Sequence, residues 1–120
     1  MSWRFDTGKA VFIQIAEKIK EDILCGKYAP NSQIPSVRQL AFDASVNPNT
    51  VQHALSSLES LGLIYTKGTT GRFVTGDAAV LDSMRSEMIS SLVASFVKSA
   101  KTLGVSSEEL IKYIKEVKPE

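Results

Sequence analysis

The fold of this chain is decided by one stretch, residues 36–61, which reads SVRQLAFDASVNPNTVQHALSSLESL. Ser36 is a good N-cap for a short helix whose apolar residues are spaced three and four apart: Val37, Leu40 and Ala41. Asn47 caps a second helix, and Pro48 occupies its first position, where no backbone donor is needed. The buried side of this helix is formed by Val51, Ala54, Leu55, Leu58 and Leu61. Two helices joined only by residues 43–46 predict a helix-turn-helix.

An amphipathic helix precedes this stretch and a short hairpin follows it. Residues 10–25 carry apolar side chains at helical spacing. Residues 27–35 contain two prolines and an Asn-Ser pair, which predict a loop. Residues 63–66 and 72–75 are typical of two strands joined by a turn at residues 67–71. The order helix, helix, helix, hairpin predicts a winged helix.

A change of composition after Gly76 indicates a second domain. We expect a winged helix-turn-helix domain at residues 1–76 and a two-helix tail at residues 77–120, so the fold class is mainly α with a small β component (α+β). Apolar residues cover about half the circumference of the tail's long helix, residues 78–103. The last helix, which begins with a capping box at Ser106, cannot cover that arc alone. We therefore expect a homodimer held by Leu81, Met84, Met88, Leu92, Phe96, Leu110 and Ile114.

Composition and charge exclude several classes of protein. Apolar residues make up 43% and charged residues 22% of the chain, as in ordinary globular domains. The net charge of +1 excludes a polybasic binder, and one Cys with one His excludes a disulfide framework and a His- or Cys-rich metal site. No apolar run is long enough to span a membrane, and the N-terminus lacks an apolar signal core. We expect a cytoplasmic protein without metal, cofactor or membrane partner.

Three blocks of residues resemble the GntR family of bacterial transcription factors. They are Phe12–Ile19, Ile34–Ala41 and Val46–Val51, and the pattern continues in Leu58–Ile64 and Phe73-Val74. The Pro-Ser-Val-Arg block, followed at this distance by Asn-Thr-Val, is a specific signal. The short tail is similar to that of the YtrA-type subfamily. This resemblance implies a dimeric repressor, often of an operon encoding an ATP-binding-cassette (ABC) transporter, and a two-fold dimer suits an inverted-repeat operator in double-stranded DNA.

The sequence departs from the family pattern in the wing and in the recognition helix. The family's Gly-x-Gly-Thr-Phe-Val tip reads Gly68-Thr69-Thr70-Gly71-Arg72-Phe73-Val74 here, one residue longer. Pro48 and Gln52 stand where many relatives carry Arg. Residues 44–58 contain no charged side chain, so attraction to DNA must come from nearby cations. These are Arg38, Lys67 and Arg72, with Lys9 and Arg4 as additions.

The recognition helix offers polar side chains on the side opposite its apolar stripe. A helix in the major groove reads base edges with its first turns. Asn49 and Gln52 suit adenine, and the methyl group of Thr50 suits thymine. His53 lies on the same exposed side. It has no acidic or thiol partner at useful spacing, and a pairing with the nearby serines lacks a supporting loop, so we do not expect an enzyme.

Other DNA contacts are expected before the recognition helix and in the wing. The resemblance implies that Arg38 contacts DNA, and its alternative role is an ion pair with Asp43. Ser36 can bind a phosphate or only cap its own helix. Arg72 is either a phosphate clamp or a solvated strand residue. The full predicted interface is Ser36, Val37, Arg38, Asn47, Pro48, Asn49, Thr50, Gln52, His53, Lys67, Gly68, Thr69 and Arg72.

Alternatives remain open for partners and regulation. The winged helix can instead serve as a protein-interaction module without sequence-specific DNA binding. Cys25 is a packed small residue or, alternatively, a redox sensor. A small-molecule effector of unknown identity would have to bind at the dimer interface or between tail and winged helix, because two helices cannot enclose a ligand pocket. The adaptable methionines Met84 and Met88 are the first place where we expect such a site, although they can equally be core or dimer contacts.

Overall fold

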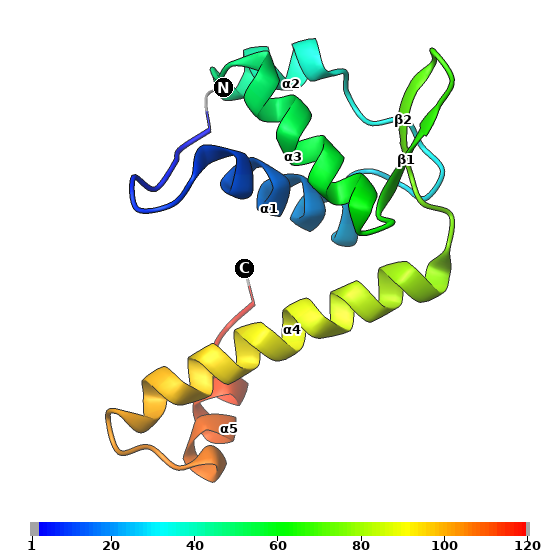
Figure 1. The fold of residues 1–120 in the computed structure, drawn as a ribbon. Coiled ribbons are helices and arrows are strands. Elements are labelled where there is room, and N and C mark those ends of the chain that lie inside the picture. Colours follow the sequence, from blue (N-terminus) through cyan, green and yellow to red (C-terminus); the bar gives the residue numbers. More distant parts are fainter. Residues whose placement is uncertain (1–2, 120) are drawn as a thin grey trace. The chain divides into compact units, whose positions relative to one another are not determined.

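The computed structural model describes residues 3–119, and its elements follow in the predicted order (Figure 1). They are α1 (Val11–Leu24), α2 (Val37–Ala44), α3 (Pro48–Ser60), β1 (Ile64–Lys67), β2 (Gly71–Val74), α4 (Ala78–Lys101) and α5 (Ser107–Glu116). This order confirms the predicted fold class, a mainly α chain in which a winged helix-turn-helix precedes two further helices. The ends differ from the prediction by a few residues, because turns rather than helix follow Lys101 and helix rather than turn follows Ala41.

Helix α3 lies at the centre of the winged helix, where it packs against α1, α2 and β1. Ile15 and Ile19 of α1 are buried, as are Val51 and Leu55 of α3. Complete burial of a side chain of this size stabilises the fold by ~1.5–3 kcal/mol. The apolar stripes that predict the helices therefore also fix the rotation of α3 about its axis. Its polar side is turned toward solvent.

The turn between α2 and α3 depends on the capping residues at its two sides. Ser36 Oγ accepts a hydrogen bond from the Gln39 amide at 3.1 Å, which caps α2. Helix α2 ends at Ser45, which adopts a left-handed conformation with φ 57°. Asn47 Oδ1 then accepts from the Asn49 amide at 2.8 Å and caps α3. The turn is thus shorter than predicted, because α2 continues through Ala44.

The wing, strands β1 and β2, gains a third segment that the sequence does not reveal. The two strands pair antiparallel from Ile64 opposite Val74 to Lys67 opposite Gly71. Residues 31–34 run along the free side of β2, with Gln33 bridging Phe73 and the Ile34 amide donating to the Arg72 carbonyl at 3.0 Å. The prediction of a plain loop at residues 27–35 is therefore incomplete, since part of it satisfies the edge of the hairpin.

The chain divides into two compact units, Met1–Ser83 and Met84–Glu120. The first contains the winged helix and the first residues of α4. The compositional change after Gly76 coincides with the start of α4 rather than with this division. Leu81 belongs to the first unit and is only 8% exposed. A dimer contact was expected for Leu81, but its burial within the chain leaves almost no surface for a partner.

The second unit consists of the rest of α4 and of α5. Ser106 Oγ accepts from the Glu109 amide at 3.2 Å, so the predicted cap of α5 is confirmed. Leu110 is 6% exposed and is likewise interior, contrary to the expected partner contact. Several other apolar side chains of this unit are exposed: Ile89, Leu92, Val93, Phe96, Ile111 and Ile114. Within residues 3–119, no helix is long and apolar enough to cross a membrane.

Candidate nucleic-acid interface

The first turns of α3 present a neutral polar surface. Asn49 and Gln52 are exposed and Thr50 is half-buried, whereas Val51 and Ala54 on the other side are completely buried. The structure therefore exposes Asn49 and Gln52 as the sequence predicts, whereas Thr50 is less exposed than expected. Pro48 is also exposed at the start of the helix. The oxygen of the Asn47 amide is engaged in the cap, which leaves the amide nitrogen as its free donor.

His53 has a packing role that its spacing does not reveal. Its ring stacks on the ring of Phe12 in α1, with centroids 3.8 Å apart and planes 12° from parallel. The side chain remains partly exposed, but one face of the imidazole is covered. His53 therefore joins α3 to α1 through this stacked contact. Nothing in the sequence around Phe12 indicates that His53 is its partner.

Helix α2 begins with residues suited to a phosphate. Arg38 is exposed, and no ion pair engages it among residues 3–119. The alternative partner Asp43 instead accepts a hydrogen bond from Gln39 Nε2 at 2.8 Å. Ser36 uses its hydroxyl oxygen for the cap, so the hydroxyl proton is left for an acceptor outside the helix. Val37, between them, is half-buried.

The wing places a second cation in solvent. Lys67 is exposed, and its Nζ lies 5.8 Å from the centroid of the Phe73 ring. The tip that follows, Gly68–Thr70, is exposed, and Gly68 adopts φ 53°. A glycine tolerates this conformation and allows close approach of a ligand to the backbone. A hollow of about 150 Å³ lies between the wing and the start of α2, lined by residues 33–37, Leu55 and 70–72.

Arg72 is engaged within the protein rather than free. Its Nε donates to Glu59 Oε1, and the hydroxyl of Thr66 donates to the same oxygen at 2.7 Å. The side chains of Arg72 and Glu59 are 18% and 31% exposed. The bond from Arg72, followed by that from Thr66, lowers the pKa of Glu59. This arrangement connects the wing to the end of α3. From the sequence, Arg72 was expected to be either a phosphate clamp or a solvated strand residue, so this structural role was not predicted.

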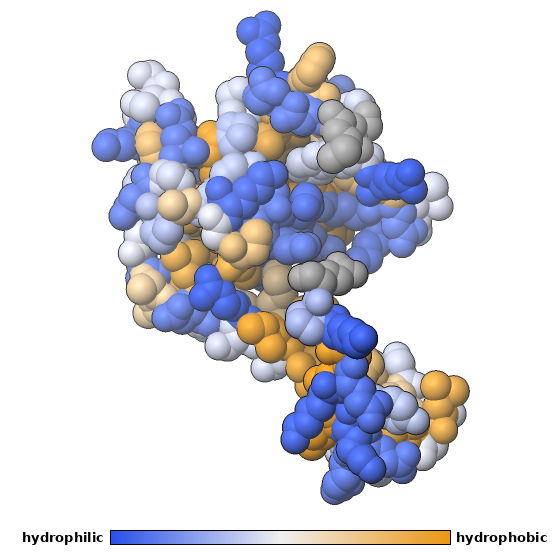
Figure 2. All heavy atoms as spheres, turned by 180° about the vertical axis from the view of Figure 1, so that it is seen from behind, coloured by the Kyte–Doolittle hydropathy of each residue, from blue (hydrophilic) through white to orange (hydrophobic). Residues whose placement is uncertain are grey.

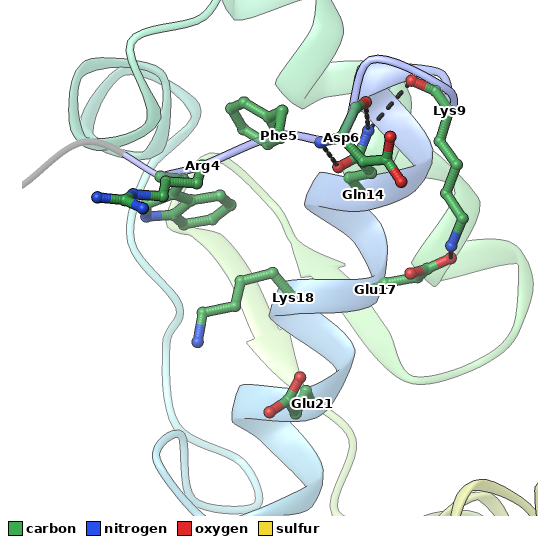
Figure 3. Close-up of a pocket in the computed structure, with 9 residues that line it drawn as sticks. Arg4, Phe5, Asp6, Lys9, Gln14, Glu17, Lys18 and Glu21 are labelled. Carbon is green, nitrogen blue, oxygen red and sulfur yellow. Dashed lines mark hydrogen bonds and ion pairs between the residues drawn. The ribbon is translucent and has the colours of Figure 1, made fainter. Parts of the chain in front are cut away.

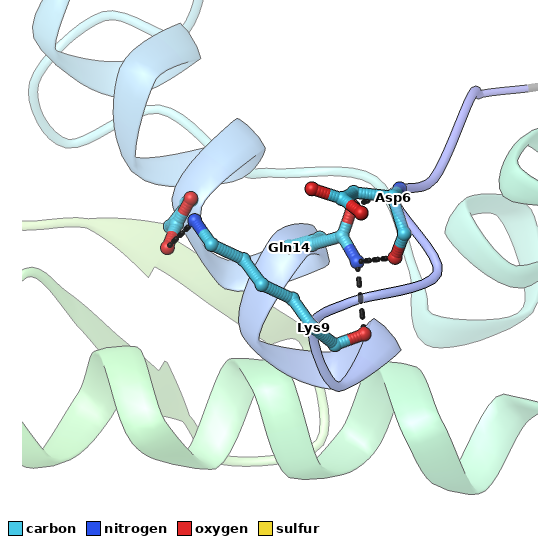
Figure 4. Close-up of polar contacts among 4 residues, drawn as sticks. Asp6, Lys9 and Gln14 are labelled. Atoms are coloured by element: carbon cyan, nitrogen blue, oxygen red, sulfur yellow. Dashed lines mark hydrogen bonds and ion pairs between the residues drawn. The ribbon is translucent and has the colours of Figure 1, made fainter.

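The segment before α1 is held against that helix chiefly by Gln14. Gln14 Nε2 donates to the Asp6 and Lys9 carbonyls, and Gln14 Oε1 accepts from the Asp6 amide at 2.7 Å (Figure 4). Lys9 also forms an ion pair with Glu17 at 3.5 Å. The sequence names Lys9 and Arg4 as additional cations for DNA. Lys9 is partly neutralised by this pairing, which weakens that role.

A hollow of about 410 Å³ opens between this segment and α1 (Figure 3). Arg4 and Phe5 lie on one side of it, and Lys18 and Glu21 of α1 lie on the other. A smaller, polar hollow of about 250 Å³ occurs on α5 beside Tyr113. Neither is lined by Met84 or Met88. Among residues 3–119, no group of three or more His, Cys, Asp or Glu side chains is placed to hold a metal ion.

The structure thus brings three predicted contact regions onto the same unit: the start of α2, the first turns of α3 and the wing. Backbone bonds link residues 31–34 to β2, and Ser36 follows two residues later. Arg38 and Lys67, which form no ion pair within residues 3–119, flank the neutral polar side of α3. This distribution is that of a DNA-binding winged helix, where phosphate contacts position the protein and base contacts specify the sequence.

Comparisons with known proteins agree with this geometry. The family described as bacterial regulatory proteins, gntR family, matches residues 13–74. Two regulators of Bacillus subtilis strain 168 are similar: the uncharacterized HTH-type regulator YhcF (33% identity, 96% of this chain, 95% of the relative) and the HTH-type repressor YtrA (34%, 89% and 83%).

Solved structures are similar as well. A GntR family transcriptional regulator from Listeria monocytogenes has a TM-score of 0.88 and 32% identity, covering 95% of this chain and all of the other. The DNA-binding domain of AraR in complex with operator ORX1 has a TM-score of 0.55 and 28% identity, covering 62% and 92%. The relatives are transcription regulators rather than enzymes. The chain belongs to the GntR family of bacterial regulatory proteins, and it is a transcription regulator with a DNA-binding winged helix.

Proposed function

We propose that the protein is a sequence-specific repressor that binds an inverted-repeat operator as a homodimer. The observation that carries the DNA-binding role is the exposed guanidinium of Arg38, which forms no ion pair within residues 3–119, beside a neutral and exposed α3 surface. A neutral reading helix needs cations on its flanks, and Lys67 supplies another on the wing. The operator complex of AraR, a structure with a related fold, supports the same use of this fold.

Within this interface each element has a distinct task. Helix α3 enters the major groove, where Asn49 and Gln52 pair with adenine edges and Thr50 contacts a thymine methyl group. Ser36, Val37 and Arg38 meet the phosphates and groove edge at the start of α2. Lys67, Gly68 and Thr69 reach the flanking groove. Asn47 and Pro48 shape the start of α3, and His53 supports the helix through Phe12.

The dimer contact is formed by α4 and α5 of a second copy of the same chain. Ile89, Leu92, Val93 and Phe96 recur at helical spacing along one side of α4, and each is about half exposed or more. Ile114 of α5 is exposed to a similar degree. Figure 2 shows orange, apolar surface on the unit that contains α5 and most of α4. An exposed apolar stripe of this kind is unfavourable in water unless a partner covers it. Two-fold pairing through the stripe would give the dimer two DNA-binding domains, as an inverted repeat requires.

A small dimer that binds a promoter is best suited to repress transcription. The related YtrA is named a repressor, and the resemblance of the short tail to the YtrA-type subfamily implies control of an operon such as one for an ABC transporter. Binding would take place in the cytoplasm. A small-molecule effector would act between the subunits of the dimer, where Met84 and Met88 are half-buried beside the apolar stripe.

The DNA-binding proposal is tested by measuring affinity for the DNA that precedes the protein's own gene. We expect Arg38→Ala to weaken binding by ~1–3 kcal/mol and to lower the salt dependence by about one ion. Lys112→Ala, which removes an exposed cation from α5, is the matched control and should leave affinity unchanged. Equal affinity of wild-type protein for promoter and random DNA would contradict sequence-specific binding.

The dimer is tested separately by the mass of the full chain in solution. Phe96→Glu should convert a dimer of ~26 kDa, twice the chain mass as two-fold pairing requires, into monomers. Ser91→Glu places the same charge on the opposite side of α4 and should leave the dimer intact. A wild-type monomer at micromolar concentration would overturn this part of the proposal.

A protein-interaction module is the second candidate, and one observation favours it. Phe42 of α2 is 80% exposed, which is unusual for an aromatic side chain of a helix-turn-helix. If DNA binding is absent and a Phe42→Ser variant loses a protein partner, this function replaces the first. If Phe42→Ser leaves operator binding unchanged and no partner is lost, the exposed ring is a surface feature only.

A further inference from the structure

The wing tip of this protein has little support from its own hairpin. Three residues, Gly68–Thr70, lie between the paired residues Lys67 and Gly71. The Thr70 amide donates to the Lys67 carbonyl at 3.0 Å, and all three tip residues are exposed. A two-stranded hairpin by itself is only marginally stable in water. The tip therefore needs an external contact to hold one position.

Gln33 provides that contact from outside the hairpin. Its Nε2 donates to the Thr70 carbonyl at 2.8 Å, across 37 residues of sequence. The backbone of Gln33 pairs with Phe73, so the side chain starts from a fixed point. Within the described part of the chain, no other hydrogen bond reaches Gly68–Thr70 from outside the wing.

Gly71 makes room for this contact. A Cβ at Gly71 would lie 2.6 Å from Gln33 Nε2, closer than real contacts allow. The residue also adopts φ 133°, a conformation that disfavours other residues. Glycine is therefore the residue that lets the Gln33 side chain pass beside β2 to the tip.

The same segment leads directly into the start of α2. The Ile34 amide bonds to the Arg72 carbonyl, and Ser36 caps α2 two residues later. Gln33 thus connects the wing tip to the element that carries Arg38. The hollow of about 150 Å³ between them is space into which an untethered tip could move.

We propose that Gln33 is a positioning residue for DNA binding, which fixes the wing tip relative to the start of α2 so that Lys67 and Arg38 engage the operator together. Gln33 acts through Thr70 and does not itself touch DNA. This inference rests on the proposed function, because it assigns a role within the DNA interface.

The tether is tested first without DNA. A spin label is attached through Thr69→Cys in a Cys25→Ser background, so that the tip carries the label. Gln33→Met keeps the length of the side chain but removes the donor, and we expect the label to become more mobile. Gln39→Met removes a similar surface amide, one bonded to Asp43 instead of the wing, and should leave the label unchanged. Gln33→Lys restores a donor and should restore the spectrum.

The consequence is then measured on unlabelled protein with the promoter DNA. Loss of one hydrogen bond of this kind corresponds to a roughly two- to twelvefold weaker affinity for Gln33→Met. We also expect lost hydroxyl-radical protection at the flanks of the site and a salt slope smaller by about one. The thermal midpoint should fall by only a few degrees, because a single exposed hydrogen bond contributes little to folding.

The possible results separate the two proposals. An unchanged label spectrum in Gln33→Met would overturn the tether, and a more mobile label with unchanged affinity and footprint would overturn the positioning role. If wild-type protein shows no preference for the promoter, the proposed function fails, and the positioning role fails with it even if the label shows that the tether exists. Weaker binding and lost flank protection in Gln33→Met, together with a more mobile label, support the inference.

Discussion

Replacing Arg72 should destabilise the winged helix rather than simply remove a DNA contact. Arg72 Nε and the Thr66 hydroxyl both donate to Glu59 Oε1, so one carboxylate joins the wing to the end of α3. Arg72→Gln removes the charge-assisted bond and leaves Glu59 with the weaker one. We expect the wing to loosen and the folded state to lose stability.

The magnitude follows from the burial of the pair. Hydrogen bonds to charged groups contribute about 1.5–3 kcal/mol when water is excluded, whereas exposed ion pairs contribute about 0.2–1 kcal/mol. With side chains 18% and 31% exposed, this pair lies between the two cases. We therefore expect a loss of ~1–2 kcal/mol, which lowers the melting temperature of a domain of this size by about 5–15 °C.

Urea unfolding of Arg72→Gln, Glu59→Gln and the double variant forms a double-mutant cycle. A shared interaction predicts that both single variants lose similar stability and that the double variant loses little more. Arg72 as a phosphate clamp predicts the opposite behaviour. Glu59→Gln would then free the guanidinium and tighten DNA binding, while Arg72→Gln would keep wild-type stability and lose about one unit of salt slope. That second pattern would refute the structural role.

The Arg72–Glu59 pair also makes the stability of the folded state depend on pH in the acid range. A carboxyl group whose pKa is lowered by folding adds stability above its unfolded pKa and loses that contribution as pH falls through the folded value. The pKa of Glu59 is lowered chiefly by Arg72 and then by Thr66. Stability should therefore fall below about pH 4.3, the ordinary Glu pKa, and the part due to Glu59 should be absent in Glu59→Gln. If the wild-type protein and Glu59→Gln lose the same stability as the pH falls, the effect is due to other carboxyl groups.

Three further predictions concern the elements that hold the interface. Asn47→Ala should cost ~1 kcal/mol in urea unfolding because it removes the cap of α3, and Asn47→Asp should retain most of that stability. Leu55→Ala should cost ~2–5 kcal/mol because the side chain is 1% exposed, and the loss should appear as a lower denaturant midpoint. His53→Ala should lose ~0.5–1.5 kcal/mol of stability through its ring contact with Phe12 and leave the base preference of the operator unchanged. A changed base preference in a selection from random DNA would show that His53 reads the operator.

Much of the fold follows from local sequence. The N-caps at Ser36, Asn47 and Ser106 lie within three residues of the backbone donors that they satisfy. The apolar stripe of α3 sets which side is buried, so the exposure of Asn49 and Gln52 follows from helical spacing alone. These features are predictable because each depends on neighbours less than two helical turns away.

The state of the charged and polar groups around the interface depends on partners far along the chain. Arg38 and Arg72 look alike in sequence, yet Arg72 is engaged by Glu59, 13 residues before it, while Arg38 has no ion pair within residues 3–119. Leu81 and Leu110 fit the expected dimer stripe but are buried within a single chain.

The sequence by itself determined the helices, the turn, the wing and the reading surface, because caps and periodicity act over a few residues. Tertiary structure alone decided which arginine is engaged in an ion pair, which leucines are buried within the chain, and that Gln33 reaches across 37 residues to the wing tip. Hydrogen bonds and ion pairs form between whichever groups the packing of the core brings within about 3–4 Å, and no local pattern encodes that distance.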